Sequence, residues 1–145
     1  MPLRTTTVTT ESRGIEFQID PDPRLAAAAG GAARYFADAA GLASEAVVEF
    51  QKSVVAACEE TFEHLSGDHA HLTVSFTLYQ DRIEVVLSHE GEALPAVGLD
   101  QIAGFGNPSE SANALGGIDR VQYEAREGRV VARLTKYWDR ASPNA

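Results

Sequence analysis

The stretch from Ser44 to about Ser66 constrains the fold most, because its apolar residues recur at the spacing of one face of an α-helix. The predicted apolar stripe consists of Val47, Val48, Val54, Val55, Cys58, Phe62 and Leu65. The opposite face consists of Glu45, Glu49, Lys52, Ala56, Glu60 and Glu63. Ser44 is expected to cap the start and Gly67 to stop the helix. A one-sided helix of this length needs a sheet that buries its stripe.

Length, composition and charge limit the class of protein. With 145 residues and 44% hydrophobic composition, the chain predicts a single domain over residues 1–138 and a frayed tail over 139–145. The net charge of −9 disfavours nucleic acid and anionic membrane as partners. It suits a basic protein partner, although an acidic surface also serves solubility alone. The N-terminus lacks an apolar leader and the alanine-rich segment is interrupted by charges and glycines, so we expect a cytoplasmic protein without a membrane span.

Two hairpins and a second helix are predicted around the central helix. The N-terminal residues 1–20 alternate as a β-hairpin that turns at residues 12–14. A helix follows over residues 23–40, capped by Asp22, ended by Gly41 and apolar on one side. Its apolar side consists of Leu25, Ala29, Ala32, Phe36, Ala39 and Ala40. After the central helix, residues 72–78 and 83–87 alternate as a hairpin that turns at Gln80 and Asp81.

The C-terminal third begins with a segment of different character. Residues 88–107 are rich in glycine and predict a long loop, and residues 107–115 predict a short helix that stops at Gly116 and Gly117. Strands over 121–125 and 129–138, joined by a turn at Glu127 and Gly128, complete the chain. This order favours an α+β fold, a two-layer α/β sandwich with a mixed or antiparallel sheet and helices packed on one face.

Isolated motifs leave several readings open. His69 and His71 could bind zinc together with Glu63 or His64, or these histidines are solvated imidazoles beside a turn. The arginines at 126, 129 and 133 could attract phosphate, or they form a solvated sheet face. Cys58 is expected to pack as a small hydrophobic residue, with a catalytic thiol as the alternative. No Walker loop, dinucleotide fingerprint, nucleophile elbow or HExxH motif occurs.

Three segments together resemble a known family. The helix segment VAACEETFEHL, the strand segment VVLSHEGEALP and the final hairpin IDRVQYEAREGRVVARLTK are similar to the ATPase domain of anti-sigma-factor serine kinases. These kinases belong to the GHKL, or Bergerat-fold, superfamily of histidine-kinase-like ATPases. The similarity covers residues 15–137 and implies the Bergerat ATP-binding fold, ATP and Mg²⁺ as cofactors, and a homodimer. It also implies a sigma factor or a STAS-type antagonist as the protein partner.

Carried over residue by residue, the family's nucleotide site is altered at every motif. The general base falls on Ala56, which cannot accept a proton, and the Mg²⁺-binding asparagine falls on Glu60. The adenine-binding Asp-x-Gly-x-Gly becomes His89, Gly91 and Ala93. The glycine-rich phosphate motif falls on residues 108–111, where Glu110 brings a negative charge to the phosphate position.

These departures favour a degenerate pseudokinase that regulates transcription by protein binding, with no cofactor and no catalytic residue. Glu60 is then the residue of the vestigial nucleotide site that is predicted to be able to hold a metal ion. Two alternatives stay open. One is an active ATP-dependent serine/threonine kinase in which Glu59, Glu60 or Glu63 replaces the base. The other is an unrelated small-molecule-binding α+β domain with its pocket under the 92–107 loop.

Overall fold

A computed structural model describes residues 13–65, 67, 70–91 and 116–138 of the chain. In this part of the chain, five strands and two helices follow one another in the order β1, α1, α2, β2, β3, β4, β5. The strands are β1 (Arg13–Ile19), β2 (Leu72–Leu78), β3 (Arg82–Glu90), β4 (Arg120–Arg126) and β5 (Arg129–Tyr137). The helices are α1 (Pro23–Ala40) and α2 (Ser44–Phe62).

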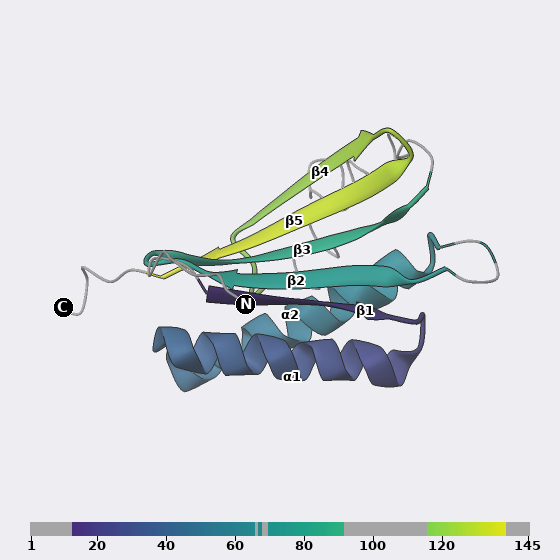
Figure 1. Ribbon diagram of the computed structural model, residues 1–145. Helices are drawn as coiled ribbons and strands as arrows, with labels where there is room; N and C mark the ends of the chain where they lie inside the picture. Colours follow the sequence, from purple (N-terminus) through teal and green to yellow (C-terminus); the bar gives the residue numbers. More distant parts are fainter. Residues whose placement is uncertain (1–12, 66, 68–69, 92–115, 139–145) are drawn as a thin grey trace, which may run out of the picture.

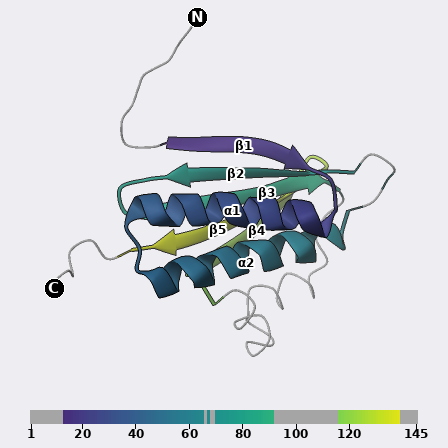
Figure 2. The same cartoon turned by 90° about the horizontal axis from the view of Figure 1, so that it is seen from below.

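The strands form one antiparallel sheet in the order β1-β2-β3-β5-β4. Both helices lie on the same face of this sheet, packed side by side (Figures 1 and 2). The predicted α+β arrangement of two layers is therefore confirmed, and the sheet is antiparallel rather than mixed. Among the residues that the structure describes, no helix is long and apolar enough to cross a membrane.

The first helix begins and ends where the sequence predicts. Asp22 caps α1 by accepting a hydrogen bond from the backbone N–H of Arg24 at 2.9 Å, and Pro23 occupies the first turn. Gly41 ends the helix in the left-handed region, at φ 84°, where a residue without a Cβ is not strained. The buried side of α1 is rotated slightly from the predicted one, because Ala26, Ala33 and Ala37 are buried while Ala39 is exposed.

The boundaries of α2 differ from the prediction at both ends. Ala43 is the capping position instead of Ser44, because its carbonyl accepts the first helical hydrogen bond, from the N–H of Val47. The helix ends at Phe62, four residues before the predicted end at Ser66. Residues 63–65 instead donate to carbonyls three residues back, which tightens the last turn. Val48, predicted on the apolar stripe, is 40% exposed.

Buried and partly buried residues alternate along β2 and β3, and the buried apolar ones belong to the core. The residues of β2 and β3 that face the helices are fully or almost fully buried, namely Leu72, Val74, Phe76, Leu78, Ile83, Val85 and Leu87. The ring of Phe76 stacks on Phe17 of β1 and on Phe36 of α1, with centroid distances of 6.2 and 5.5 Å. Phe50 of α2, which the sequence analysis did not place on the stripe, is also fully buried.

The strand register corrects the predicted turn at 12–14 and the predicted start of the 88–107 loop. The predicted turn between the last two strands is confirmed. Arg13 and Gly14 pair with Leu78 and Thr77, so they belong to β1 and not to the predicted turn at 12–14. The 5–11 strand, the 107–115 helix and most of the 88–107 loop lie outside the described residues. Residues 88–90 extend β3 against residues 129–131 instead of opening that loop. Glu127 and Gly128, both at positive φ, form the predicted turn between β4 and β5.

Candidate functional site

The residues at the family's base and Mg²⁺ positions lie on α2, one turn apart and away from its fully buried side. Ala56 is half-buried, and the side chain of Glu60 is 53% exposed. The side chain of Ala56 is a methyl group, which cannot accept a proton, so this residue cannot act as a general base. Glu59 and Glu63, the other candidate bases, are also exposed.

The carboxylate of Glu60 has an imidazole as its neighbour. His64 lies one turn further along the chain, and its Nε2 is 3.9 Å from Glu60 Oε2. No group of three or more histidine, cysteine, aspartate or glutamate side chains in the described residues is arranged to hold a metal ion. His69, one member of the predicted zinc site, lies outside those residues. Glu60 as a metal ligand therefore stays a prediction.

Tyr123, a residue that the sequence analysis placed only as part of a strand, completes the surroundings of Glu60. It lies on the helix-facing side of β4. Burial raises the pKa of Tyr123 above its ordinary value of about 10, and the charge of Glu60 adds to this effect. The alternation of Val121, Tyr123 and Ala125 predicted a strand, and no signal in the sequence placed this phenol beside α2.

We expect stability to fall as the pH rises above about 10, because the unfolded chain then ionises the phenol of Tyr123 while the folded chain retains its proton. Tyr123→Phe should remove this part of the alkaline loss, whereas Tyr35→Phe, at an exposed position, should not. Denaturant unfolding of the three proteins at neutral and alkaline pH measures the difference. An identical alkaline loss in wild type and Tyr123→Phe would show that the phenol ionises normally.

The segment that leads into β4 is attached to α2 through a buried serine. The N–H of Gly117 donates to Ser53 Oγ at 2.8 Å, and Ser53 is 1% exposed. Gly117 packs against the helix backbone so closely that an added Cβ would lie 2.6 Å from the nitrogen of Phe50. The sequence predicted Gly117 only as a helix stop. A serine in line with Phe50 and Val54 on α2 was the available sign of this contact.

The residues at the predicted adenine motif lie at the end of β3. His89 is 5% exposed and follows Leu87 on the helix-facing side of the sheet, with its Nδ1 2.9 Å from the carbonyl oxygen of Glu90. Gly91 donates its N–H to the carbonyl of Gly128 at 2.8 Å, which ties the end of β3 to the β4–β5 turn. The predicted site residues Ala93 and Glu110 lie outside the described residues.

A cavity of about 200 Å³ lies beside His89, between the end of α2, the start of β2 and the β4–β5 turn. It is lined by Leu65, Gly67, Ala70, His71, His89, Glu90 and Arg129. Neither Ala56 nor Glu60 lines it. The structure thus separates the carried-over site residues into a pair on α2 and a histidine in a cavity wall.

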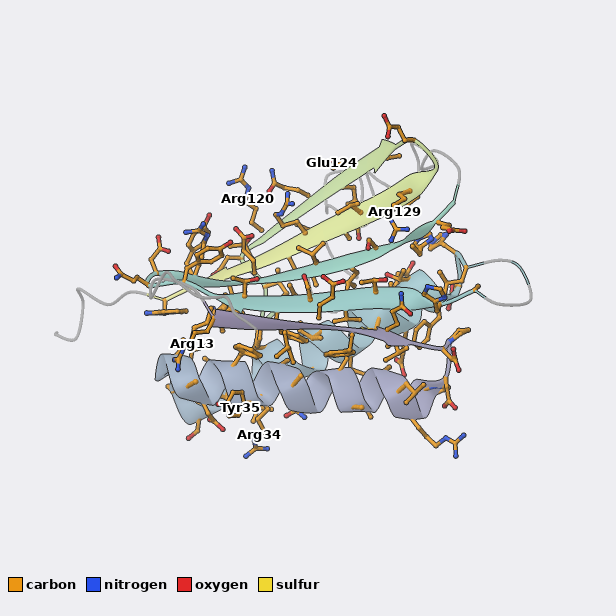
Figure 3. The ribbon with its side chains drawn as sticks, viewed as in Figure 1. Arg13, Arg34, Tyr35, Arg120, Glu124 and Arg129 are labelled. Carbon is orange, nitrogen blue, oxygen red and sulfur yellow. The ribbon has the colours of Figure 1, made fainter. Side chains whose placement is uncertain are left out.

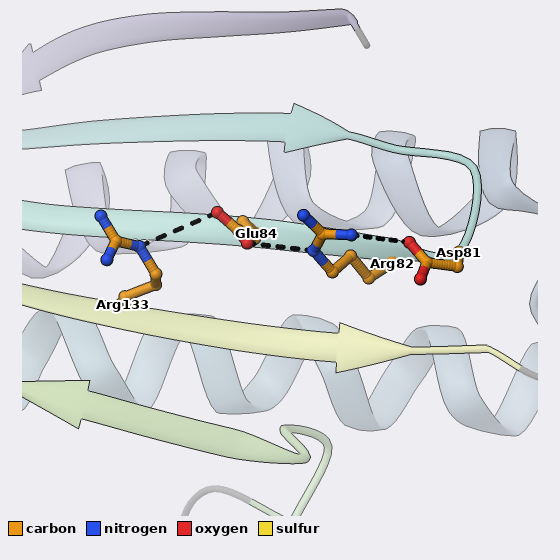
Figure 4. A network of polar contacts seen from close by, with 4 residues as sticks. All are labelled: Asp81, Arg82, Glu84 and Arg133. Atoms are coloured by element: carbon orange, nitrogen blue, oxygen red, sulfur yellow. Dashed lines mark hydrogen bonds and ion pairs between the residues drawn. The ribbon is translucent and has the colours of Figure 1, made fainter. Parts of the chain in front are cut away.

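Arg120, Arg129 and Arg133 lie on the face of the sheet that carries no helix in the described part of the chain. Figure 3 shows Arg120, Glu124 and Arg129 there, far from Arg13, Arg34 and Tyr35 beside α1 and β1. In the network of Figure 4, Arg133 lies 3.8 Å from Glu84, which also accepts a hydrogen bond from Arg82 at 3.0 Å. Glu84 offsets part of this positive charge, so Arg133 is a weaker phosphate attractor than the sequence suggested.

Cys58 is fully buried, and burial raises the pKa of its thiol to about 12. We expect the native protein to resist Ellman's reagent and the denatured protein to react with one equivalent, because only the thiolate is nucleophilic. Fast reaction of the native protein would instead support the catalytic-thiol alternative.

No protein-family model matches the sequence, and no curated protein has a significant match to it.

Proposed function

We propose that this chain is a degenerate Bergerat-type domain, similar to anti-sigma-factor serine kinases, that regulates transcription by binding a protein. The order of its elements supports the proposal, because α2 precedes the central β2–β3 hairpin and the adenine-motif residues fall at the end of β3.

The proposed loss of catalysis rests on two residues of α2, Ala56 and Glu60. Ala56 offers no proton acceptor, and Glu60 presents a carboxylate where an uncharged amide would ligate Mg²⁺ next to a triphosphate. Two negative groups close together repel unless a cation lies between them. We therefore propose that neither ATP nor Mg²⁺ is a working cofactor and that no residue is catalytic. If a cation does bind, Glu60 is its proposed ligand.

The surface of α2 suits a basic partner. The exposed side of the helix and its C-terminal cap carry five carboxylates, on Glu45, Glu49, Glu59, Glu60 and Glu63, against the single cation of Lys52. Such a surface speeds the association of a positively charged protein. A cytoplasmic sigma factor or a STAS-type antagonist is the proposed partner.

A homodimer is proposed to form at the β1 edge of the sheet. β1 pairs with β2 on one side, and no strand in the described part of the chain pairs with its other side. Ile15 on β1 is 47% exposed at this edge. An open strand edge with an exposed apolar residue is a common site of pairing between chains.

Isothermal titration calorimetry with ATP, with and without Mg²⁺, tests the loss of the nucleotide site. We expect no binding up to millimolar nucleotide, and micromolar affinity would instead establish the kinase alternative. Partner binding is tested separately, by identifying proteins that co-purify from the native host and remeasuring their affinity with pure components. Glu59→Lys combined with Glu63→Lys should slow association by about tenfold at low salt. Glu16→Lys on β1 is the matched control, and equal rates for both variants would remove α2 from the interface.

A further inference from the structure

The helix-facing side of the edge strand β1 is left partly bare. Helix α1 packs against β2 and β3, and Figure 2 shows β1 clear of it. Ile15 is therefore 47% exposed, although it pairs with the fully buried Phe76 on the same side of the sheet. The ring of Phe76 stacks on Phe36, and Phe36 in turn contacts Tyr35, which is 66% exposed. Ile15 and Tyr35 thus border the same pair of stacked rings.

The charges along β1 suit a second copy of the same chain in antiparallel orientation. Residues 13–19 carry one cation, Arg13, and one anion, Glu16, so this edge is locally neutral on a chain with a net charge of −9. Arg13 begins the strand and Asp20 follows its last residue, and both are exposed. Antiparallel pairing of two β1 strands brings Arg13 of each copy toward Asp20 of the other, whereas parallel pairing would set like charges side by side.

Like charges disfavour two of the registers that such a pair could adopt near the middle of β1. Successive side chains of a strand point to opposite faces, so a symmetric pair that keeps all helices on one face is centred on a single residue. A centre on Glu16 sets two carboxylates directly opposite each other, and a centre on Gln18 sets Glu16 opposite Asp20. Like charges directly opposite destabilise a strand pair.

The two other central registers differ in where they place Arg13. A centre on Ile15 sets Arg13 opposite Phe17, three residues away from Asp20 of the other copy. A centre on Phe17 brings Arg13 to within one residue of that carboxylate along the strand. The second register also pairs more of β1, because its centre lies further from the start of the strand.

We propose that two copies of this chain pair through antiparallel β1 strands centred on Phe17, so that the two sheets form one continuous sheet. On the helix side, Ile15 of each copy then faces Ile19 of the other, and Phe17 faces its own counterpart. On the open side, Glu16 faces Gln18. Apolar residues meet apolar ones and polar residues meet polar ones, and the bare side of β1 is covered. This inference rests on the proposed homodimer and is independent of the proposed loss of nucleotide binding.

Cysteine variants of the full chain test the register, because residues directly opposite on antiparallel strands have Cα atoms about 4.5–5.5 Å apart, within reach of a disulfide. Phe17→Cys should form a disulfide-linked dimer under mild oxidation. An equimolar mixture of Glu16→Cys and Gln18→Cys should give the mixed dimer, and neither variant should link to itself. Glu49→Cys, at an exposed position on α2, is the control for random collision. The native Cys58 is fully buried and is common to all variants.

Sedimentation velocity measures the dimer itself. Ile15→Lys should raise its dissociation constant by about tenfold or more, because the substitution places a charge in the interface. Val48→Lys, at a position that is 40% exposed on α2, should leave the dissociation constant unchanged. Circular dichroism establishes that each variant is folded, and the mixture of Glu16→Cys and Gln18→Cys, both at exposed positions, carries the test if Phe17→Cys does not fold.

The outcomes separate the register from the homodimer. A wild-type protein that is monomeric at every concentration, because another segment occupies the β1 edge, would overturn both. A wild-type dimer in which Ile15→Cys or Glu16→Cys links to itself would overturn the register alone. A wild-type dimer in which no β1 variant cross-links faster than Glu49→Cys would show that the chains associate through another surface.

Discussion

Replacing Gly117 with alanine is expected to lower the free energy of unfolding by about 3 kcal/mol. A Cβ at this position would overlap the carbonyl of Glu49 and lie 2.6 Å from the nitrogen of Phe50, both in the backbone of α2. A helix backbone cannot move aside as a flexible side chain can. The shift would also lengthen the buried hydrogen bond from Gly117 to Ser53. Chemical denaturation measures the loss.

Gly31→Ala is the matched control for this prediction. Gly31 lies on the exposed side of α1, and an added Cβ there meets no atom within 4 Å. Alanine has the higher helix propensity, so this substitution should stabilise the protein by up to about 1 kcal/mol. Equal stability of Gly117→Ala and wild type would show that the segment before β4 is not packed against α2 as described.

Phe76→Ala is expected to cost about 3–5 kcal/mol, the range for removing a large aromatic side chain from a core. Phe76 is fully buried in the middle of β2, and its ring lies between those of Phe17 and Phe36. The substitution therefore removes one side-chain contact of β2 with the edge strand β1 and one with helix α1. Two stacked aromatic contacts are lost together with the buried area.

Tyr35→Ala serves as the comparison for Phe76→Ala, because Tyr35 is an aromatic residue that is 66% exposed on α1. Its ring makes an edge contact with Phe36, so we expect a loss below about 1 kcal/mol. Thermal and urea unfolding of both variants should rank them in this order. A Phe76→Ala protein that unfolds at the wild-type urea concentration would contradict the packing described for the core.

The regular parts of the fold were predictable because local chemistry decides them. Asp22 and Pro23 start α1 and Gly41 ends it, and strict alternation identified β2 and β3. The end of α2 was not predictable, since residues 63–65 close a tighter turn instead of continuing to Gly67. The place of Val48 also depends on tertiary packing, because α2 turns Val47 and Phe50 toward the sheet and leaves Val48 at the surface.

The candidate site was predictable only in part. The sequence placed Ala56 and Glu60 on one helix, and the structure agrees with those positions. His89 was predicted to lie in a loop that opens at Ser88, but it belongs to β3 and is buried in the wall of a cavity. The contact between Gly117 and Ser53 joins residues 64 positions apart, which no local pattern encodes.

The central claim is that α2 occupies the place of a nucleotide-binding helix and that its present side chains exclude the nucleotide. The most direct measurement is the calorimetric affinity for ATP with Mg²⁺ of a variant that combines Ala56→Glu with Glu60→Asn. Glu63→Asn, which removes one charge elsewhere on the helix, is the control. We predict that wild type and control do not bind, and that the double variant gains measurable affinity. A folded double variant that, like wild type, shows no binding of ATP would contradict the account.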